Sequence, residues 1–181
     1  MHSVKIGDVE VQWFGHASFC ITDGTRIVYI DPFVIPDDVE QADLILITHE
    51  HFDHLHEANV ARLKKHDTIV LGSQGSVSNL GYGRPMQAGQ DVDFGHIKVD
   101  AVEAYNTTKF RSPGNPFHPK GLGVGFIVTL GGKAIYHAGD TDHIREMAAL
   151  HGKIDAALLP IGGTYTMTVG EAAEAAQGIK P

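Results

Sequence analysis

Short apolar runs separated by turn residues dominate the first third of the chain. Apolar runs and alternating positions bounded by polar clusters are typical of strands. This pattern predicts strands at Val9–Trp13, Ser18–Ile21, Arg26–Ile30 and Asp43–Ile47. Beyond them, the apolar pattern predicts an amphipathic helix at Glu57–Lys65, a strand at Thr68–Leu71 and a short helix at Ser73–Leu80.

The rest of the chain returns to strands punctuated by a few helices. Strands are predicted at Val92–Phe94, Ile97–Val102, Gly123–Leu130, Lys133–Tyr136 and Ile154–Leu159. A helix is predicted from Asp142 to about Leu150, and a capping box at Thr168–Glu171 begins a final helix with Gly178 as its C-cap. This order does not fit a simple parallel βαβ repeat. It favours the α+β class, with two packed sheets and helices outside them, in a single domain of 181 residues.

Two segments between strands carry turn residues. Lys109 to Lys120 is a long polar excursion rich in proline, and such loops either form the rim of a substrate site or are disordered. The glycines Gly121, Gly123 and Gly125 lack the lysine of a P-loop and lead into a strand. We therefore expect them to allow close packing at the sheet.

Composition limits the classes of partner. With 43% hydrophobic and 20% charged residues the chain is ordinary for a globular protein, and its formal net charge of −8 repels nucleic acid. Cys20 is the sole cysteine, which excludes an internal disulfide and a thiolate-rich metal site. No apolar run reaches membrane-spanning length, and no signal-like segment follows Met1–Lys5. We expect a cytoplasmic protein with a small-molecule substrate and no nucleic-acid or membrane partner.

A dense group of ligand side chains follows the apolar run Asp43–Ile47. His49, His51, Asp53 and His54 form the pattern H-x-H-x-D-H. Imidazole nitrogens together with a carboxylate oxygen suit zinc, manganese or iron. In an extended segment His49, His51 and Asp53 would share one face, while His54 would begin the next turn and serve a second ion. The rival interpretation is a surface cluster among the 12 histidines, but the position directly after a buried strand favours a metal site for hydrolysis.

Two further carboxylates end predicted strands. Asp140 could bridge two metals or cap the helix predicted from Asp142, and the histidine cluster favours ligation. Asp31 precedes Pro32, and it could orient a ligand imidazole or simply end its strand.

Several motifs together resemble those of the metallo-β-lactamase superfamily. They are Phe14-Gly15-His16-Ala17-Ser18-Phe19, Ile30-Asp31-Pro32-Phe33, Thr48 to His54, Tyr136-His137-Ala138-Gly139-Asp140-Thr141 and Leu159-Pro160-Ile161-Gly162-Gly163. The similarity points to its branch of small metal-dependent hydrolases related to ascorbate-6-phosphate lactonase. The resemblance implies an αββα four-layer sandwich with the site at one edge of the two sheets.

The resemblance also implies a role for each ligand residue. The implied ligands are His49 and His51 for the first metal, Asp53 and His54 for the second, and Asp140 as a bridge between them. Asp31 would support them by holding a ligand. A metal-bound hydroxide would attack an ester-like or lactone-like centre, and Asp53 would act as the catalytic group that accepts or shuttles a proton.

The chain departs from the superfamily pattern at two places. Members usually supply a third histidine to the first metal after the strand that ends near Val102. This chain has no histidine there, and Glu103 and His118 are the two candidates to replace it. Members also continue past the position of Pro181 into a strand with a last histidine ligand, so we expect the chain to be truncated at its C-terminus.

The leading hypothesis is a metal-dependent hydrolase of a small anionic metabolite, such as a lactone, an ester or a phosphorylated sugar derivative. Two alternatives stay open: a phosphodiesterase or nuclease of the same superfamily, and a catalytically incomplete metal-binding fragment. One or two divalent ions are expected, with zinc first and manganese or iron as alternatives. Association into an oligomer through an unpaired sheet edge also stays open.

Overall fold

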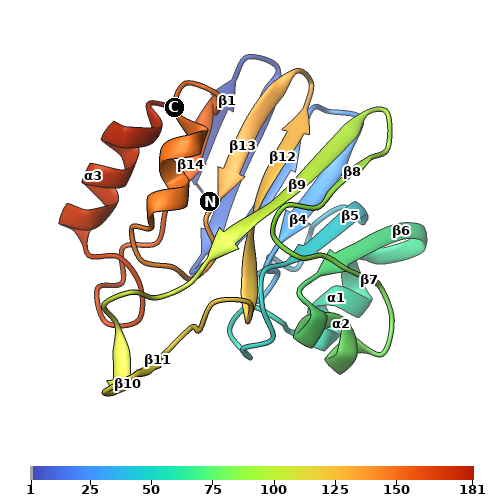
Figure 1. Ribbon diagram of the computed structural model, residues 1–181. Coiled ribbons are helices and arrows are strands. Elements are labelled where there is room, and N and C mark those ends of the chain that lie inside the picture. Colours follow the sequence, from blue (N-terminus) through green and yellow to red (C-terminus); the bar gives the residue numbers. More distant parts are fainter. Residues whose placement is uncertain (1) are drawn as a thin grey trace. The chain divides into compact units, whose positions relative to one another are not determined.

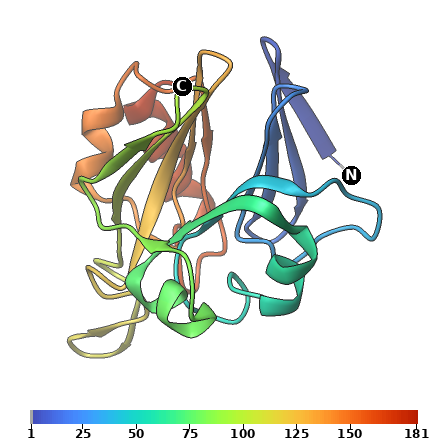
Figure 2. The same ribbon diagram turned by 90° about the vertical axis from the view of Figure 1, so that its right-hand side faces the viewer.

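A computed structural model describes residues 2–181 (Figures 1 and 2). Over this range the chain forms two compact units, an N-terminal unit that ends at Met86 and a C-terminal unit of residues 87–181. In Figure 2 the first strands of the N-terminal unit are blue and its short helices are green. Among residues 2–181, none of the helices has the length and apolar content that a membrane span requires.

The N-terminal unit is built on one sheet of seven strands within residues 2–86, which follow one another in the order β1 to β7. These strands are β1 (His2–Ile6), β2 (Val9–Gly15), β3 (Ser18–Thr22), β4 (Ile27–Ile30), β5 (Ala42–Ile47), β6 (Lys64–Gly72) and β7 (Arg84–Pro85). The pairs from β1 to β4 are antiparallel, and those from β4 to β7 are parallel. Because β4 and β5 run in the same direction, the residues that follow them meet at one edge of the sheet.

Two short helices complete the N-terminal unit. Helix α1 (Glu57–Leu63) begins at His56, whose side chain accepts a hydrogen bond from the Asn59 backbone. Its buried residues Val60 and Leu63 join a core that includes Tyr29 and Ile45 of the sheet. Helix α2 (Gln74–Leu80) begins after Ser73, whose hydroxyl accepts from the Ser76 backbone. Both helices lie within the ranges predicted from the sequence, and each begins after a side chain that caps its first turn.

The C-terminal unit is built on a second sheet, with the strand order β14-β13-β12-β9-β8. Its strands are β8 (Asp91–Asp93), β9 (Ile97–Ala104), β12 (Gly123–Leu130), β13 (Lys133–His137) and β14 (Ala156–Leu158). The 3₁₀ helix η1 (Arg145–Leu150) and helix α3 (Val169–Ile179) lie together beside this sheet (Figure 1). Ala172, Ala175 and Ile179 of α3 are buried with Met147 of η1 in one core.

Two local predictions for the C-terminal unit are wrong, the helix from Asp142 and the C-cap at Gly178, and a third segment has more structure than its sequence indicates. The helix predicted from Asp142 begins only at Arg145 and is a 3₁₀ helix, because the Asp142 side chain and backbone bond to residues 105–109 instead. Helix α3 runs through Gly178 and ends at Lys180, which adopts a left-handed φ of 51°. The polar excursion contains a small hairpin, formed by β10 (Phe110–Ser112) and β11 (Asn115–Pro116).

Candidate metal centre

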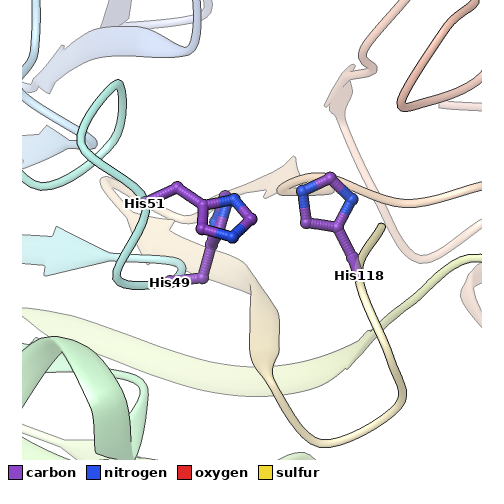
Figure 3. A group of neighbouring side chains, drawn as sticks. All are labelled: His49, His51 and His118. Carbon is purple, nitrogen blue, oxygen red and sulfur yellow. The ribbon is translucent and has the colours of Figure 1, made fainter. Parts of the chain in front are cut away.

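The histidine motif follows β5 and folds as a turn. The backbone N–H groups of His54 and Leu55 both donate to the His51 carbonyl, at 3.0 and 2.9 Å. The turn begins at His51, so the extended arrangement does not continue to Asp53. The turn brings His54 back toward the start of the motif, with ring centroids 4.0 Å apart for His49 and His54 and 4.6 Å apart for His49 and His51. Figure 3 shows the rings of His49 and His51 side by side.

Asp31 holds this turn from the end of β4. Its buried carboxylate accepts from the backbone N–H and the hydroxyl of Thr48, both at 2.7 Å, and lies 2.7 Å from Nδ1 of His54. Since the carboxylate can only accept, it favours the tautomer of His54 with the proton on Nδ1 and a lone pair on Nε2. Asp31 itself has a left-handed φ of 45°. Of the two roles considered for Asp31, the structure thus shows the one that orients an imidazole.

The nitrogens of His49 and His51 are spaced for a single ion. Nδ1 of His49 lies 2.9 Å from the Thr48 hydroxyl, which leaves Nε2 as the nitrogen for a metal. That Nε2 lies 3.1 Å from Nδ1 of His51. Two nitrogens bound to one tetrahedral zinc ion lie about 3.3 Å apart. The donor set and its spacing therefore fit a divalent metal.

His16 is a residue of this site to which sequence reasoning gave no role. It lies in the turn between β2 and β3, and its Nε2 is 3.3 Å from Oδ2 of Asp53. Its ring meets that of His54 edge to face, with centroids 5.0 Å apart. The motif Phe14 to Phe19 marks the segment in the sequence, but contacts across turns of this kind leave no periodic signal.

The C-terminal unit contributes a second pair of candidate ligands. Asp140 follows β13 after a left-handed Gly139 with φ 64°. Its Oδ2 lies 3.3 Å from Nε2 of His118, a buried residue that precedes β12. Figure 3 draws the His118 ring at the end of its loop. Asp140 is thus paired with a histidine, and the helix-capping role considered for it is wrong because the segment after it is not helical.

Asn106 fixes the orientation of His118. Its Oδ1 accepts from the His118 backbone N–H at 2.7 Å and lies 3.0 Å from Nδ1 of the ring. Its Nδ2 donates to Asp142 at 3.0 Å. Burial raises the pKa of Asp142, but hydrogen bonds from Thr108, Thr107 and Asn106 outweigh it, so the net pKa is lowered. Asp142 is therefore a strong acceptor that fixes which way the Asn106 amide points.

Glu103, the other candidate for the missing third histidine, is engaged elsewhere. Its carboxylate forms an ion pair with Lys120 at 3.1 Å. It also lines a groove of about 330 Å³ together with Val102, Met147 and Leu150. The described contacts of the C-terminal unit thus favour His118 over Glu103 as the partner of Asp140.

The two sheets, the histidine motif and the strand-end carboxylates define a metallo-β-lactamase fold. A family model described as a beta-lactamase superfamily domain matches residues 10–181, and the chain belongs to this family. The chain is 38% identical to a UPF0173 metal-dependent hydrolase of Pyrococcus furiosus, with 96% of this chain and 81% of that protein covered.

Solved structures agree with this assignment. The chain matches a protein of Parabacteroides distasonis, named as a candidate metal-dependent hydrolase, with a TM-score of 0.88 and 36% identity over 96% of this chain and 79% of that chain. It also matches Igni18, a metallo hydrolase from Ignicoccus hospitalis, with a TM-score of 0.74 and 26% identity over 96% of this chain and 79% of that chain. The predicted superfamily and α+β fold class are confirmed.

Proposed function

We propose that the chain is a metal-dependent hydrolase that acts on a small anionic metabolite with one or two divalent ions. The observation that carries this proposal is the arrangement of three imidazoles at one sheet edge, His49, His51 and His54. Thr48 holds His49 through Nδ1, and Asp31 holds His54 through Nδ1. Buried polar groups that preset the nitrogen facing a ligand are typical of metal sites. Similarity to proteins named metal-dependent hydrolases supports the same function.

The proposed ligands come from both units of the chain. His49 and His51 would bind the first ion with His118 as the third histidine, Asp53 and His54 would bind the second, and Asp140 would bridge the two. The spacing of His49 and His51 and the pairing of His118 with Asp140 support this assignment. Zinc suits these nitrogen and carboxylate donors, and manganese and iron share them.

The chain's own residues supply the proton transfers. When bound, a divalent metal would supply a Lewis acid that lowers the pKa of water toward neutrality. Asp53 is the group placed to take up or return a proton at the carboxylate oxygen that does not bind metal, because its side chain is 32% exposed. Asp31 and Asn106 keep the Nδ1 protons of His54 and His118 in place while this happens.

The proposed substrate class is a lactone, an ester or a phosphorylated sugar derivative. The formal net charge of −8 disfavours a nucleic-acid polymer, because the negative field of the protein would repel its many phosphates. A small anion carries fewer charges and is therefore repelled less. We also propose a cytoplasmic location, which the single buried cysteine, Cys20, supports by giving the fold no need of an oxidising compartment.

The test combines metal analysis with a substrate panel. The purified chain, a His49→Ala/His51→Ala variant and a His66→Ala/His96→Ala control at two exposed histidines are loaded with zinc and measured for metal by mass spectrometry. Each is then assayed on a sugar lactone, an aryl ester and an aryl phosphodiester. We expect lactone or ester hydrolysis that falls at least a hundredfold in the first variant and not in the control. Equal metal and activity in all three proteins would contradict the proposal, and hydrolysis of the phosphodiester alone would favour the nuclease alternative.

A further inference from the structure

His16 lies against two of the proposed metal ligands. Nε2 of His16 is 3.3 Å from Oδ2 of Asp53, and one ligand atom from each of His16, Asp53 and His54 lies within 4.8 Å of the others. We propose that His16 is a ligand of the second metal ion, in addition to Asp53, His54 and the bridging carboxylate proposed above. This inference rests on the proposed function in that the chain must bind divalent metal.

The distances within this group suit a shared ion. Two ligands bound to one tetrahedral zinc, a nitrogen at about 2.0–2.1 Å and a carboxylate oxygen at about 2.0–2.2 Å, lie about 3.4 Å apart. The His16–Asp53 distance of 3.3 Å is close to this value. His54 has its Nδ1 2.7 Å from Asp31, so Nε2 is the nitrogen it presents to the other two residues. All three donors come from the N-terminal unit, which therefore supplies three of the proposed ligands of this ion.

The backbone at His16 is shaped to present the ring. His16 has a left-handed φ of 50°, and Gly15 before it has a φ of 127°. A left-handed φ is uncommon for a residue with a side chain and persists only where surrounding contacts hold it. Here the Trp13 indole N–H donates to the His16 carbonyl at 2.8 Å, and the β2–β3 register shifts between Trp13 and Gly15.

The same turn is fastened to the segment that orients His54. The buried Ser18 hydroxyl donates to the Asp31 carbonyl at 2.6 Å and accepts from the backbone of Phe33 and Val34 at 3.1 and 2.9 Å. Asp31 in turn holds His54 through its carboxylate. The turn that carries His16 and the ring of His54 are therefore both held by Asp31, the first through Ser18 and the second directly, as the ligands of a preorganised site are.

The rival explanation is that His16 and Asp53 form only a surface ion pair. Their side chains are 42% and 32% exposed, and an ion pair at such exposure contributes little to stability. It gives no reason for the left-handed backbone or for the network behind it. The two explanations differ in the metal affinity that they predict once the His16 ring is removed. An ion pair alone predicts no change, and a metal ligand predicts weaker binding.

The experiment compares metal binding in His16→Asn with that of the unchanged chain. Asparagine tolerates a left-handed φ, so the turn is kept while the imidazole is lost. Cobalt(II) and zinc titrations monitored by visible absorption give the affinity of each site, and paramagnetically shifted imidazole N–H signals report the histidines bound to cobalt. We expect two ions in the chain, at least tenfold weaker binding of one of them in His16→Asn, and one fewer shifted signal. His66→Ala, at an exposed histidine, serves as the matched control.

Each outcome decides between the two proposals. Unchanged affinities and signals in His16→Asn overturn the role of His16. If the chain binds a single ion that is lost in His49→Ala/His51→Ala and kept in His16→Asn, the proposed function stands and the His16 ligand is rejected. If the chain binds no metal, both fail. Thermal melts in chelator check whether the substitution disturbs the fold. A lower melting temperature in metal-free His16→Asn, together with an unchanged metal affinity after refolding at lower temperature, would assign His16 a structural role and overturn the proposal.

Discussion

At the scale of single residues, Asn106 selects which nitrogen of His118 faces Asp140. The Asn106 amide is buried and shared between His118 on one side and Asp142 on the other. It also donates to the Tyr165 carbonyl at 2.9 Å. An amide held at both ends cannot flip, so the His118 proton stays on Nδ1 and Nε2 stays with Asp140.

Replacing Asn106 by leucine should therefore weaken metal binding without removing a ligand. We expect a loss of about 10–100-fold in zinc affinity, because the imidazole loses the partner that fixes its tautomer. We also expect a loss of about 1–3 kcal/mol in the free energy of unfolding, because the Asp142 carboxylate loses a buried donor. Chelator competition and urea unfolding measure the two effects.

The matched control for this change is Thr108→Val. It removes the Thr108 hydroxyl, which donates to Asp142 at 3.0 Å, and leaves the contact between Asn106 and His118 in place. Zinc affinity should stay within about threefold of the unchanged chain, since His118 keeps its partner. A control that weakens zinc as much as Asn106→Leu would show that Asp142, and not the tautomer of His118, sets the affinity.

At the scale of elements, Gly125 lets β12 lie close to β13. A Cβ atom added at Gly125 would be 3.0 Å from the carbonyl oxygens of both His137 and Ala138 and 3.1 Å from Val102. Two of these three neighbours are backbone atoms of the segment that leads to Asp140. The close packing predicted for the glycine run is thus confirmed at Gly125.

Two alanine substitutions should differ in their effect for this reason. Gly125→Ala should lower the free energy of unfolding by about 1–3 kcal/mol, since backbone cannot move away without disturbing the sheet. Gly75→Ala in α2 would overlap only the carboxylate of Glu50, the flexible end of a side chain. It should change stability by less than about 1 kcal/mol, because the gain in helix propensity offsets the displaced carboxylate. Urea unfolding of both variants tests this, and equal losses would contradict it.

Asp43 joins three neighbouring strands at one end of the N-terminal sheet. Its carboxylate accepts from the Ile27 backbone of β4 and from Lys65 of β6, both at 2.8 Å, and pairs with Arg26 at 3.4 Å. Burial raises the pKa of Asp43, but the Lys65 hydrogen bond, the Ile27 N–H and the nearby positive charges outweigh it. The net pKa therefore lies below the ordinary value of 3.8.

Stability should consequently depend on pH through Asp43. A lowered pKa in the folded state adds stability above the ordinary value of 3.8, and this stability is lost as the pH falls through the folded-state pKa. Asp43→Asn should cost about 1–2 kcal/mol at pH 7, and the difference from the unchanged chain should shrink below about pH 3.8. Urea unfolding at pH 7 and at pH 3 measures it. Asp37→Asn, at an exposed carboxylate, is the control, and a cost that stays constant with pH would contradict the assignment.

Most elements could be predicted because their signals are local. Strands β2 to β5 and helices α1 and α2 follow from apolar runs, alternation and helical spacing. The segment after Asp140 could not, because its helical pattern competes with bonds from Asp142 to residues more than 30 positions away. The end of α3 was also missed, since Lys180 takes the left-handed position that glycine usually fills.

At the scale of the whole molecule, the sequence predicts the ligand types better than it predicts what orients them. The H-x-H-x-D-H spacing and the strand-end positions of Asp31 and Asp140 are readable without a structure. His16 and Asn106 are not, because their contacts depend on a left-handed turn and on an amide shared between distant segments. Asn106 orients His118, which lies outside the motif, and His16 pairs with Asp53 of the motif. The organisation of the site therefore lies in turns and loops, where sequence patterns carry the least information.

Metal should stabilise the folded chain, because the ligands from separate parts of the sequence come together only in that state. At free zinc about a thousandfold above the dissociation constant, the gain is about 4 kcal/mol. For a chain of 181 residues this corresponds to a rise in melting temperature of roughly 8–16 °C over the chelator-treated protein. Differential scanning calorimetry with zinc and with EDTA measures the rise.

The variants at the histidines separate specific binding from adventitious binding. His49→Ala/His51→Ala should lose at least half of the zinc-dependent rise, since it removes the paired nitrogens that lie 3.1 Å apart. His66→Ala/His96→Ala should keep all of it, because both residues are exposed and outside the proposed ligand set. An equal rise in the two variants would mean that zinc stabilises through surface histidines. A zinc-dependent rise in melting temperature that is kept only in the exposed-histidine variant would show that metal binding after β5 is coupled to folding. The ions bound at that site would then be the ones that stabilise the native state.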